Sequence, residues 1–283
     1  MTALLFALLM SGCASTQMAV VLKPVADMYS RPSRDADVVS QAIYGSNVAV
    51  QETGEGWLKI QTSDEYSGWV PAEHLRVLAS GERPYASSAS VQVESLFAHI
   101  YHEPSVTKRR PMLTVPFETR LEPAGSRFED GERWIKVRLP DNARGWIQKG
   151  DVTAGTRVLS MAETIDLARR FLGLPYTWGG TSSFGYDCSG FVQMLYRKHG
   201  ISLPRDSRPQ ARWKGFVAVE GEEPVAGDLL YFGSAPEKIT HTGMYIGDDQ
   251  FIHATAHEKP VIQISRLADP HWSQLLVAIR RLK

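Results

Sequence analysis

Short stretches of alternating hydrophobic and polar residues mark the first half of the chain. Residues 57–60 (WLKI) and residues 134–137 (WIKV) both show this alternation. A period of two places every second side chain on the same face of a strand, and the Pro, Gly and Asp residues between the stretches favour turns. The first half is therefore predicted to consist of short antiparallel strands.

The pattern changes near residue 160, where a helix is expected. Ser160 and Glu163 form a capping-box sequence ahead of apolar residues at helical spacing, and Gly173 closes the segment. A second helix is predicted to begin at Cys188, with Asp187 as its cap. A third domain, containing both helices and strands, is expected to begin here.

Strands follow the second predicted helix. Residues 227–232 (GDLLYF) have the composition of a buried strand. Residues 241–246 and 250–255 flank the sequence Gly-Asp-Asp at 247–249, which is typical of a β-hairpin turn. The third domain is therefore predicted to be α+β.

An internal repeat divides the all-β half into two units. Residues 54–60 (GEGWLKI) align with residues 131–137 (GERWIKV), and each copy continues to a Gly-Trp pair, at 68–69 and at 145–146. The separation between the two tryptophans is the same in both copies. The repeat predicts two small barrels of similar structure.

The repeat resembles bacterial SH3-like domains, two in tandem, with groove aromatics that bind extended peptides. Residues 79–90 (ASGERPYASSAS) have the composition of a linker. The expected order is two SH3-like barrels followed by a papain-like α+β domain, at residues 20–79, 90–153 and 156–283.

The composition is that of a globular protein. Of 283 residues, 43% are hydrophobic and 22% are charged, which is sufficient for a buried core. Lys and Arg together number 31, as do Asp and Glu, so no basic surplus is available to neutralise phosphates. Nucleic acid is not expected as a partner.

The N-terminus contains a short apolar run, residues 3–10 (ALLFALLM), followed by Ser11-Gly12-Cys13. This arrangement resembles a bacterial lipoprotein signal, which implies a signal peptide at residues 1–12 and a lipid on Cys13. The mature protein would then be exported, with residues 13–19 as a tether to a membrane facing the periplasm or cell wall. Residues 1–12 lack Lys and Arg, and a disordered apolar N-terminus is the alternative.

Cys188 is the second of two cysteines, so lipidation of Cys13 would leave it without a disulfide partner. A lone cysteine is usually a small buried apolar residue. At the start of a helix, however, the helix dipole and free N–H groups favour the thiolate over the thiol. This position favours a nucleophile.

A nucleophilic cysteine needs a base, and the base needs a group that orients it. His241 and His253 lie on the two strands of the predicted hairpin, where they would be opposite or diagonal to each other. Cys188, His241 and His253 are therefore predicted to act as nucleophile, base and orienting group.

Five motifs stand in order between about residue 156 and residue 283: YxWGG at 176–180, DCSGF at 187–191, GDL at 227–229, HxGxYIG at 241–247 and FIHA at 251–254. In sequence and spacing they resemble the NlpC-type cysteine peptidases, papain-like enzymes that cut bacterial cell-wall peptides. Two preceding barrels are similar to the branch that hydrolyses the γ-D-glutamyl to L-diamino-acid bond. The resemblance implies a substrate among peptidoglycan stem peptides (muropeptides) with a free N-terminal L-Ala and diaminopimelate.

The resemblance also implies the residue roles. Cys188 would be the nucleophile, His241 the general base and acid, and His253 the polar third member. The backbone N–H of Cys188 would stabilise the oxyanion, with Asp187 in support and the Tyr176 hydroxyl as a second donor. Packing of Tyr176 beneath the turn at Trp178 is the alternative for that residue.

Residues 204–210 (PRDSRPQ) resemble the family segment that recognises a free N-terminal amine. The resemblance implies that Asp206 and Ser207 bind substrate, together with Ser189 and with Tyr66 of the first barrel. A carboxylate suits this role because an ammonium buried without a counter-charge is costly. A surface ion pair between Asp206 and a neighbouring arginine is the alternative.

Other classes of function remain open. His253 and His257, with Cys188, His241 and His271, could form a zinc set. The glutamate of an H-E-x-x-H helix is missing and the segment is predicted to be a strand, so neither a metal nor another cofactor is expected. A non-catalytic wall-binding protein is a second alternative. A third is an endopeptidase that opens D-alanyl to diaminopimelate cross-links in polymeric murein.

Overall fold

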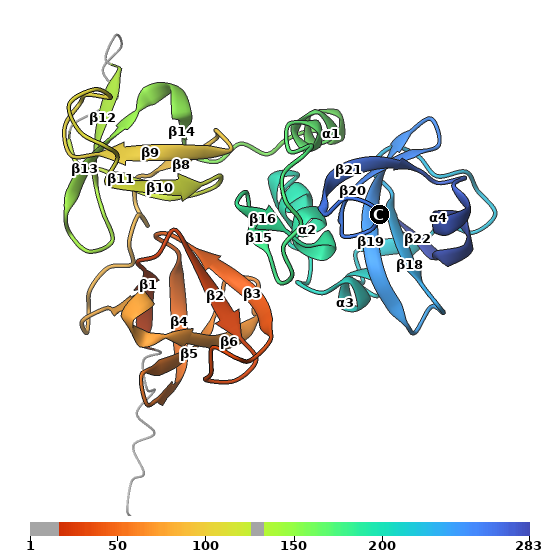
Figure 1. Ribbon diagram of the computed structural model, residues 1–283, viewed down its shortest axis with the longest axis horizontal. Coiled ribbons are helices and arrows are strands. Elements are labelled where there is room, and N and C mark those ends of the chain that lie inside the picture. The colour runs from red at the N-terminus through yellow and green to blue at the C-terminus, as the bar shows by residue number, and fades with distance from the viewer. Residues whose placement is uncertain (1–16, 126–132) are drawn as a thin grey trace, which may run out of the picture.

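The computed structural model describes residues 17–125 and 133–283. Cys13, the predicted lipidation site, and the Gly131-Glu132 part of the repeat lie outside these residues. Within them, the chain forms two units built from strands and one unit of helices and strands. In Figure 1 the two β units lie one above the other, and the mixed unit lies beside them.

The first β unit (residues 18–77) is a seven-stranded antiparallel sheet with the strand order β3-β2-β6-β5-β4-β1-β7. The predicted alternation is confirmed, since Leu58 and Ile60 are buried in its core. The elements are β1 (Met18–Val21), β2 (Val25–Tyr29), β3 (Val38–Ile43), β4 (Asn47–Gly54), β5 (Trp57–Gln61), β6 (Ser67–Pro71), the short 3-10 helix η1 (Ala72–His74) and β7 (Leu75–Val77).

The second β unit (residues 91–154) repeats this order with each strand number raised by seven, as β10-β9-β13-β12-β11-β8-β14. The repeated tryptophans make the same contact: Trp57 meets Tyr29 edge-on at 5.5 Å, and Trp134 meets Tyr101 edge-on at 5.3 Å. The elements are β8 (Val91–Val93), β9 (Phe97–Tyr101), β10 (Leu113–Pro116), β11 (Arg120–Pro123), β12 (Trp134–Arg138), β13 (Arg144–Gln148), η2 (Lys149–Asp151) and β14 (Val152–Ala154).

The mixed unit contains a six-stranded sheet with the order β17-β22-β18-β19-β20-β21. Its helices are α1 (Met161–Arg169), α2 (Cys188–Lys198), α3 (Ser207–Ala211) and α4 (Pro270–Leu275). Its strands are β15 (Thr181–Ser182), β16 (Gly185–Tyr186), β17 (Phe216–Ala218), β18 (Leu229–Gly233), β19 (Ile239–Gly247), β20 (Gln250–Thr255), β21 (Val261–Arg266) and β22 (Leu276–Leu282). None of the helices in the described ranges is long and apolar enough to cross a membrane.

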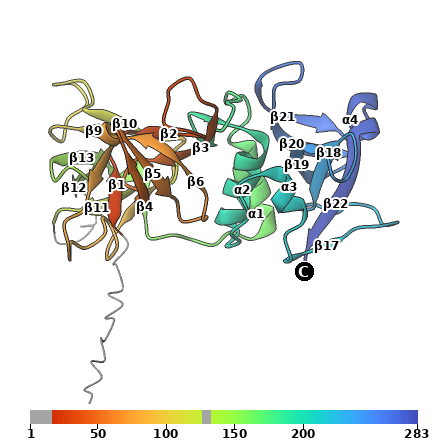
Figure 2. The same ribbon diagram turned by 90° about the horizontal axis from the view of Figure 1, so that it is seen from below.

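Two clusters of buried side chains cover the two faces of this sheet. Helices α1 and α2 pack on one face against residues such as Tyr231 and Ile252, and Trp272 of α4 packs on the other face against Phe232 and Phe251. Figures 1 and 2 both place α1 and α2 between the β units and the sheet. The helices therefore separate the β units from the sheet core.

Local signals in the sequence form these elements, although α1 ends at Arg169 and residues 170–173, up to the predicted end at Gly173, form a turn. Ser160 and Glu163 form the capping box of α1. Asp187 caps α2 by accepting a hydrogen bond from the backbone N–H of Gly190. Asp248 and Asp249 have φ values of +52° and +60°, which a tight hairpin turn between β19 and β20 requires.

Helix α2 is also held by both β units. The amide of Gln193 donates a hydrogen bond to Asp64 of the first β unit at 2.8 Å. Further along the helix, Arg197 forms an ion pair with Glu118 of the second β unit at 2.6 Å. Three separate units therefore fix the orientation of one helix.

A buried arginine completes the helix cap. The guanidinium of Arg205, which is 2% exposed, donates to both carboxylate oxygens of Asp187, at 3.0 and 2.5 Å. It also donates to the hydroxyl of Ser189 and, across the unit boundary, to the hydroxyl of Ser40. The two-pronged geometry suits a planar guanidinium and could not be reproduced by lysine.

We predict that Arg205→Ala lowers the free energy of unfolding by about 3–5 kcal/mol, because it leaves the Asp187 carboxylate buried without its counter-charge. Urea denaturation measures this loss. The matched control is Arg212→Ala, which removes an exposed arginine whose side chain forms no hydrogen bond or ion pair with the described residues. A loss of stability no larger than that of the control would contradict the prediction.

Candidate active site

Cys188 lies at the N-terminus of α2, with its side chain 8% exposed. Helix α2 packs against β19, and the backbone N–H groups of Thr242 and Ser189 hydrogen-bond the Cys188 sulfur. Thr242 directly follows His241 in β19. The fold thereby brings the predicted nucleophile beside the strand that carries the predicted base.

The structure differs from the sequence-based expectation of a thiolate. The pKa of the Cys188 thiol is raised to about 12, mainly by burial and also by the nearby Asp187 carboxylate, while the two N–H groups and Arg205 act in the opposite direction. Burial also lowers the pKa of His241 to about 3, with smaller effects from His271 and His257. The effect of desolvation on the pKa of Cys188 is larger here than the effect of the helix N-terminus. The resting pair is therefore a neutral thiol and a neutral imidazole.

His241 and His253 form the contact that the hairpin predicts. Nε2 of His241 lies 2.7 Å from Nδ1 of His253. Nε2 of His253 in turn lies 3.0 Å from the hydroxyl oxygen of Ser265 on β21. His253 is fully buried, and burial holds its pKa well below the usual value. The result is a line of hydrogen-bonded side chains across three neighbouring strands.

The absence of a side chain at Gly243 makes room for this line. A Cβ at that position would lie 3.0 Å from Cβ of His253 and 2.8 Å from the Phe251 ring. The HxG spacing in β19 therefore allows the imidazole of the next strand to lie close to the backbone.

Aromatic rings enclose the two histidines. The centroid of the Trp272 ring is 5.1 Å from that of His241 and 4.8 Å from that of His253. Phe251 also contacts His253, with ring centroids 4.4 Å apart, and it contacts Trp272 as well, with ring centroids 5.5 Å apart. Sequence reasoning missed Trp272 and Ser265, since neither falls in a motif that resembles the family.

The residues of the zinc alternative are arranged differently. His257 and His271 stack face to face at 3.7 Å, so their ring planes rather than their nitrogen lone pairs face each other. Both ring nitrogens of His253 face other side chains, His241 and Ser265. No group of metal-ligating side chains suited to an ion occurs in residues 17–125 and 133–283.

Desolvation raises the pKa of the Tyr176 hydroxyl, and the nearby Cys188 and Asp187, when ionised, raise it further. The same residue is partly buried and packs against the core of the mixed unit. Trp178, two residues later, is 71% exposed. Tyr176 therefore lies near the Cys188 thiol and also contacts the core of the mixed unit.

Asp206 does not pair with its neighbouring arginines. Arg205 binds Asp187, and Arg208 donates to the carbonyl of Ile239. Instead, the hydroxyl of Tyr66 in the first β unit donates to Asp206 at 3.3 Å. Desolvation raises the pKa of the Asp206 carboxyl above its usual value.

Asp206 is also the residue before α3, but its side chain makes no capping hydrogen bond. Ser207 is the first residue of that helix. Asp206 and Tyr66 therefore meet at the boundary between the first β unit and the mixed unit. The Asp206 carboxylate can still accept hydrogen bonds from a further donor.

Ser189 is placed differently from the other predicted binding residues. Its side chain is buried, donates to Asp187 at 3.3 Å and accepts from Arg205 at 2.9 Å. These contacts orient the helix cap. Arg205 itself stands inside the segment 204–210, but its contact with Asp187 depends on tertiary structure that the sequence motif does not reveal.

Comparisons with known proteins agree with this geometry. Residues 173–281 match the NlpC/P60 family, and residues 28–75 match a bacterial dipeptidyl-peptidase SH3 domain. A γ-D-glutamyl-L-lysine dipeptidyl-peptidase of Bacillus cereus is 34% identical over 260 residues, covering 86% of this chain and 74% of that protein. A protein of the same description from Bacillus subtilis is 28% identical over 257 residues, covering 87% and 82%.

A solved structure shows the same overall arrangement. The crystal structure of an NlpC/P60 family protein from Bacillus cereus superposes with a TM-score of 0.80 at 28% identity, covering 94% of this chain and 99% of that one. The expected SH3-like domain ahead of an NlpC-type domain is confirmed. The chain therefore belongs to the NlpC/P60 family and is a cysteine peptidase with a bacterial SH3 domain ahead of its catalytic domain.

Proposed function

We propose that this protein hydrolyses the bond between γ-D-glutamate and an L-diamino acid, diaminopimelate, in cell-wall stem peptides with a free N-terminal L-Ala. The observation that carries the proposal is the contact between Tyr66 and Asp206. The contact lies at the boundary of the first β unit and the mixed unit, near the helix that carries Cys188, and the Asp206 carboxylate forms no ion pair with a cation in the described residues. An ammonium is the group that such a carboxylate binds best.

Relatives support this choice of bond. Two of them are named γ-D-glutamyl-L-lysine dipeptidyl-peptidase, and they align with most of this chain, β units included. A dipeptidyl-peptidase removes two residues from a free amino end, so it needs a group that recognises that end. Asp206, with Ser207 and the Tyr66 hydroxyl, is proposed to do this here.

The hydrogen bonds among His241, His253 and Ser265 favour a Cys-His-His mechanism in which one nitrogen of His241 takes the thiol proton. Nε2 of His241 faces His253, which leaves Nδ1 of His241 to accept the thiol proton. In this tautomer, the Nε2–H group of His241 donates a hydrogen bond to Nδ1 of His253, and the Nε2–H group of His253 donates one to the Ser265 hydroxyl oxygen. His253 thus holds the one tautomer of His241 that can act as a base.

In the proposed reaction, the Cys188 sulfur attacks the γ-carbonyl carbon of D-Glu as His241 takes the thiol proton. The backbone N–H of Cys188, with the Tyr176 hydroxyl, stabilises the oxyanion. His241 returns the proton to the departing amine, which leaves a thioester on Cys188. Water, activated by His241, then hydrolyses the thioester and releases L-Ala-D-Glu.

We propose a supporting role for Asp187 and Ser189. Both side chains bind Arg205 and each other, so they position the backbone N–H groups at the start of α2. The Ser189 hydroxyl is occupied by these contacts, and its proposed contribution to binding is therefore indirect.

The second β unit is proposed to be a second SH3-like domain. It has the strand order of the first unit and the same Tyr–Trp contact. The proposed boundaries are 20–79 and 90–153 for the two barrels, close to the limits of the two seven-stranded sheets, and 156–283 for the catalytic domain.

We predict that Cys188→Ala abolishes hydrolysis of L-Ala-γ-D-Glu-diaminopimelate, because it removes the sulfur that forms the thioester. His241→Ala is expected to lower kcat/KM by at least about a thousandfold through loss of the base. Product release followed by mass spectrometry measures both effects, and circular dichroism shows that the fold is kept. Hydrolysis at the wild-type rate by either variant would exclude the proposed roles.

A second prediction concerns the free amine. The wild type should cleave L-Ala-γ-D-Glu-diaminopimelate at least about a hundredfold faster than its N-acetyl form, because acetylation removes the ammonium that binds Asp206. Asp206→Ala should lose this preference by slowing on the free peptide, with kcat/KM measured for both substrates.

Tyr66→Phe is the matched variant, since it removes only the hydroxyl that contacts Asp206. It should reduce the preference by less than Asp206→Ala does. Equal rates on both peptides in the wild type would instead favour an endopeptidase acting on D-alanyl to diaminopimelate cross-links.

Lipid anchoring through Cys13 is proposed on sequence alone, from the apolar run that ends in Ser11-Gly12-Cys13. We predict that Cys13→Ser moves the protein from the membrane fraction to the soluble fraction of bacterial cells, because it removes the lipid attachment point. Fractionation and immunoblotting measure this shift. Wild-type protein found only in the soluble fraction would refute the anchor.

A further inference from the structure

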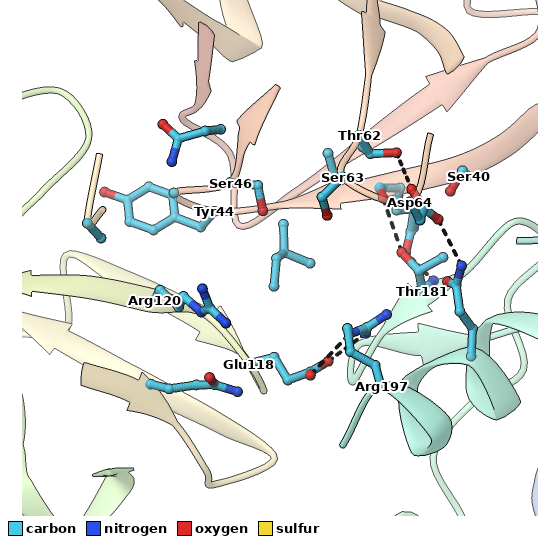
Figure 3. A pocket seen from close by; sticks show the side chains of 18 of the residues that line it. Ser40, Tyr44, Ser46, Thr62, Ser63, Asp64, Glu118, Arg120, Thr181 and Arg197 are labelled. Carbon is cyan, nitrogen blue, oxygen red and sulfur yellow. Dashed lines mark hydrogen bonds and ion pairs between the residues drawn. The ribbon is translucent and has the colours of Figure 1, made fainter. Parts of the chain in front are cut away.

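A cavity of about 440 Å³ lies where the two β units and the mixed unit meet (Figure 3). Its wall includes the turn between β3 and β4, the start of β11 and the side of α2 that carries Gln193 and Arg197. Cys188, His241 and His253 do not line it. The cavity is therefore separate from the proposed catalytic centre, although both lie along α2.

One part of the wall carries a positive charge and a free acceptor. Arg120 on β11 is paired with Gln92 on β8 in the sheet, so the two side chains share a face. The Arg120 guanidinium forms no hydrogen bond or ion pair with any residue in the described ranges, and it points into the cavity in Figure 3. Gln92 is 3% exposed, yet its Oε1 atom has no partner there.

A buried carbonyl oxygen without a hydrogen bond is uncommon in native proteins and calls for a donor. Arg120 and Gln92 together offer a guanidinium for a carboxylate and, beside it, an acceptor for an N–H group. The C-terminal end of a peptide has both of these ligand groups, a carboxylate and the amide N–H group next to it.

Another part of the wall carries a negative charge. Asp64 accepts hydrogen bonds from Thr62 and Gln193, which are both neutral, and no described cation forms an ion pair with it. Glu118, in contrast, is paired with Arg197 at 2.6 Å, so those two charges compensate each other. Figure 3 shows Asp64 and Arg120 on opposite sides of the cavity.

We propose that this cavity binds a short zwitterionic peptide. Its carboxylate would bind Arg120, its amide N–H would donate to Oε1 of Gln92, and its ammonium would face Asp64. A simple anion would be repelled by Asp64, and a simple cation by Arg120. The volume lies within the range of about 300–1,000 Å³ found for small-ligand sites.

The proposal does not depend on which bond the enzyme cuts. L-Ala-D-Glu, the dipeptide that the proposed reaction releases, carries the ammonium, the amide N–H and the carboxylate that the site would bind, together with one further carboxylate, and it serves as the probe. Because that dipeptide could also occupy the amine pocket at Asp206, the experiment must separate the two sites.

Isothermal titration of the full-length Cys188→Ala protein with L-Ala-D-Glu tests the proposal. We expect a binding event that Arg120→Ala weakens at least tenfold and that Asp206→Ala leaves unchanged. The control is Arg144→Ala, which removes an exposed arginine of the same β unit, without a side-chain partner in the described residues, at a site outside the cavity. It should bind as the parent protein does.

Two further measurements sharpen the test. N-acetyl-L-Ala-D-Glu should bind this site at least tenfold more weakly, because it lacks the ammonium that faces Asp64. Arg120→Ala in the otherwise wild-type protein should hydrolyse L-Ala-γ-D-Glu-diaminopimelate at the wild-type rate. No detectable binding, equal affinities for Arg120→Ala and Arg144→Ala, or loss of all binding in Asp206→Ala would overturn the proposal.

Discussion

The buried ion pair between Arg205 and Asp187 is the contact on which the active-site geometry depends. Asp187 caps α2 and thereby sets the direction of the free N–H groups around Cys188. Arg205 neutralises that cap, reaches Ser40 of the first β unit and directly precedes Asp206 in the chain. Two desolvated charges need not add net stability, since their desolvation offsets most of the attraction. Their effect is to fix the distance between the thiol and the proposed amine-binding carboxylate.

The β units act on the site through the same helix. Gln193, Arg197 and Lys198 of α2 bind Asp64, Glu118 and Glu94, so both β units contact the helix away from its reactive end. Pairs with exposed members contribute little to stability individually, but together they restrict rotation of α2. The separate cavity shares two of these residues, Gln193 and Arg197. A ligand bound in that cavity would therefore contact the helix that carries Cys188.

Local features could be predicted from the sequence because short-range chemistry determines them. The capping box at Ser160, the Asp187 cap and the hairpin that pairs His241 with His253 each depend on residues close in the chain. The contact of Arg205 with Ser40 joins residues 165 positions apart and has no local signal. The thiolate expectation for Cys188 was wrong for a related reason, since burial depends on packing that a helix start does not reveal. The cavity could not be predicted at all, because three separately folded units enclose it.

A neutral resting pair has consequences for how the site handles charge. Aromatic rings and burial disfavour an imidazolium at His241 in the free protein, so the thiol keeps its proton until a carbonyl is present to be attacked. In the proposed reaction, attack would create an oxyanion near the start of α2, where N–H groups and the helix dipole stabilise negative charge. The proton would move to His241 in the same step, and the imidazolium would then lie close to this new negative charge. In the resting site, desolvation opposes an isolated charge. It also strengthens the attraction between two opposite charges that form together. The transition state is therefore favoured over the ionised free enzyme.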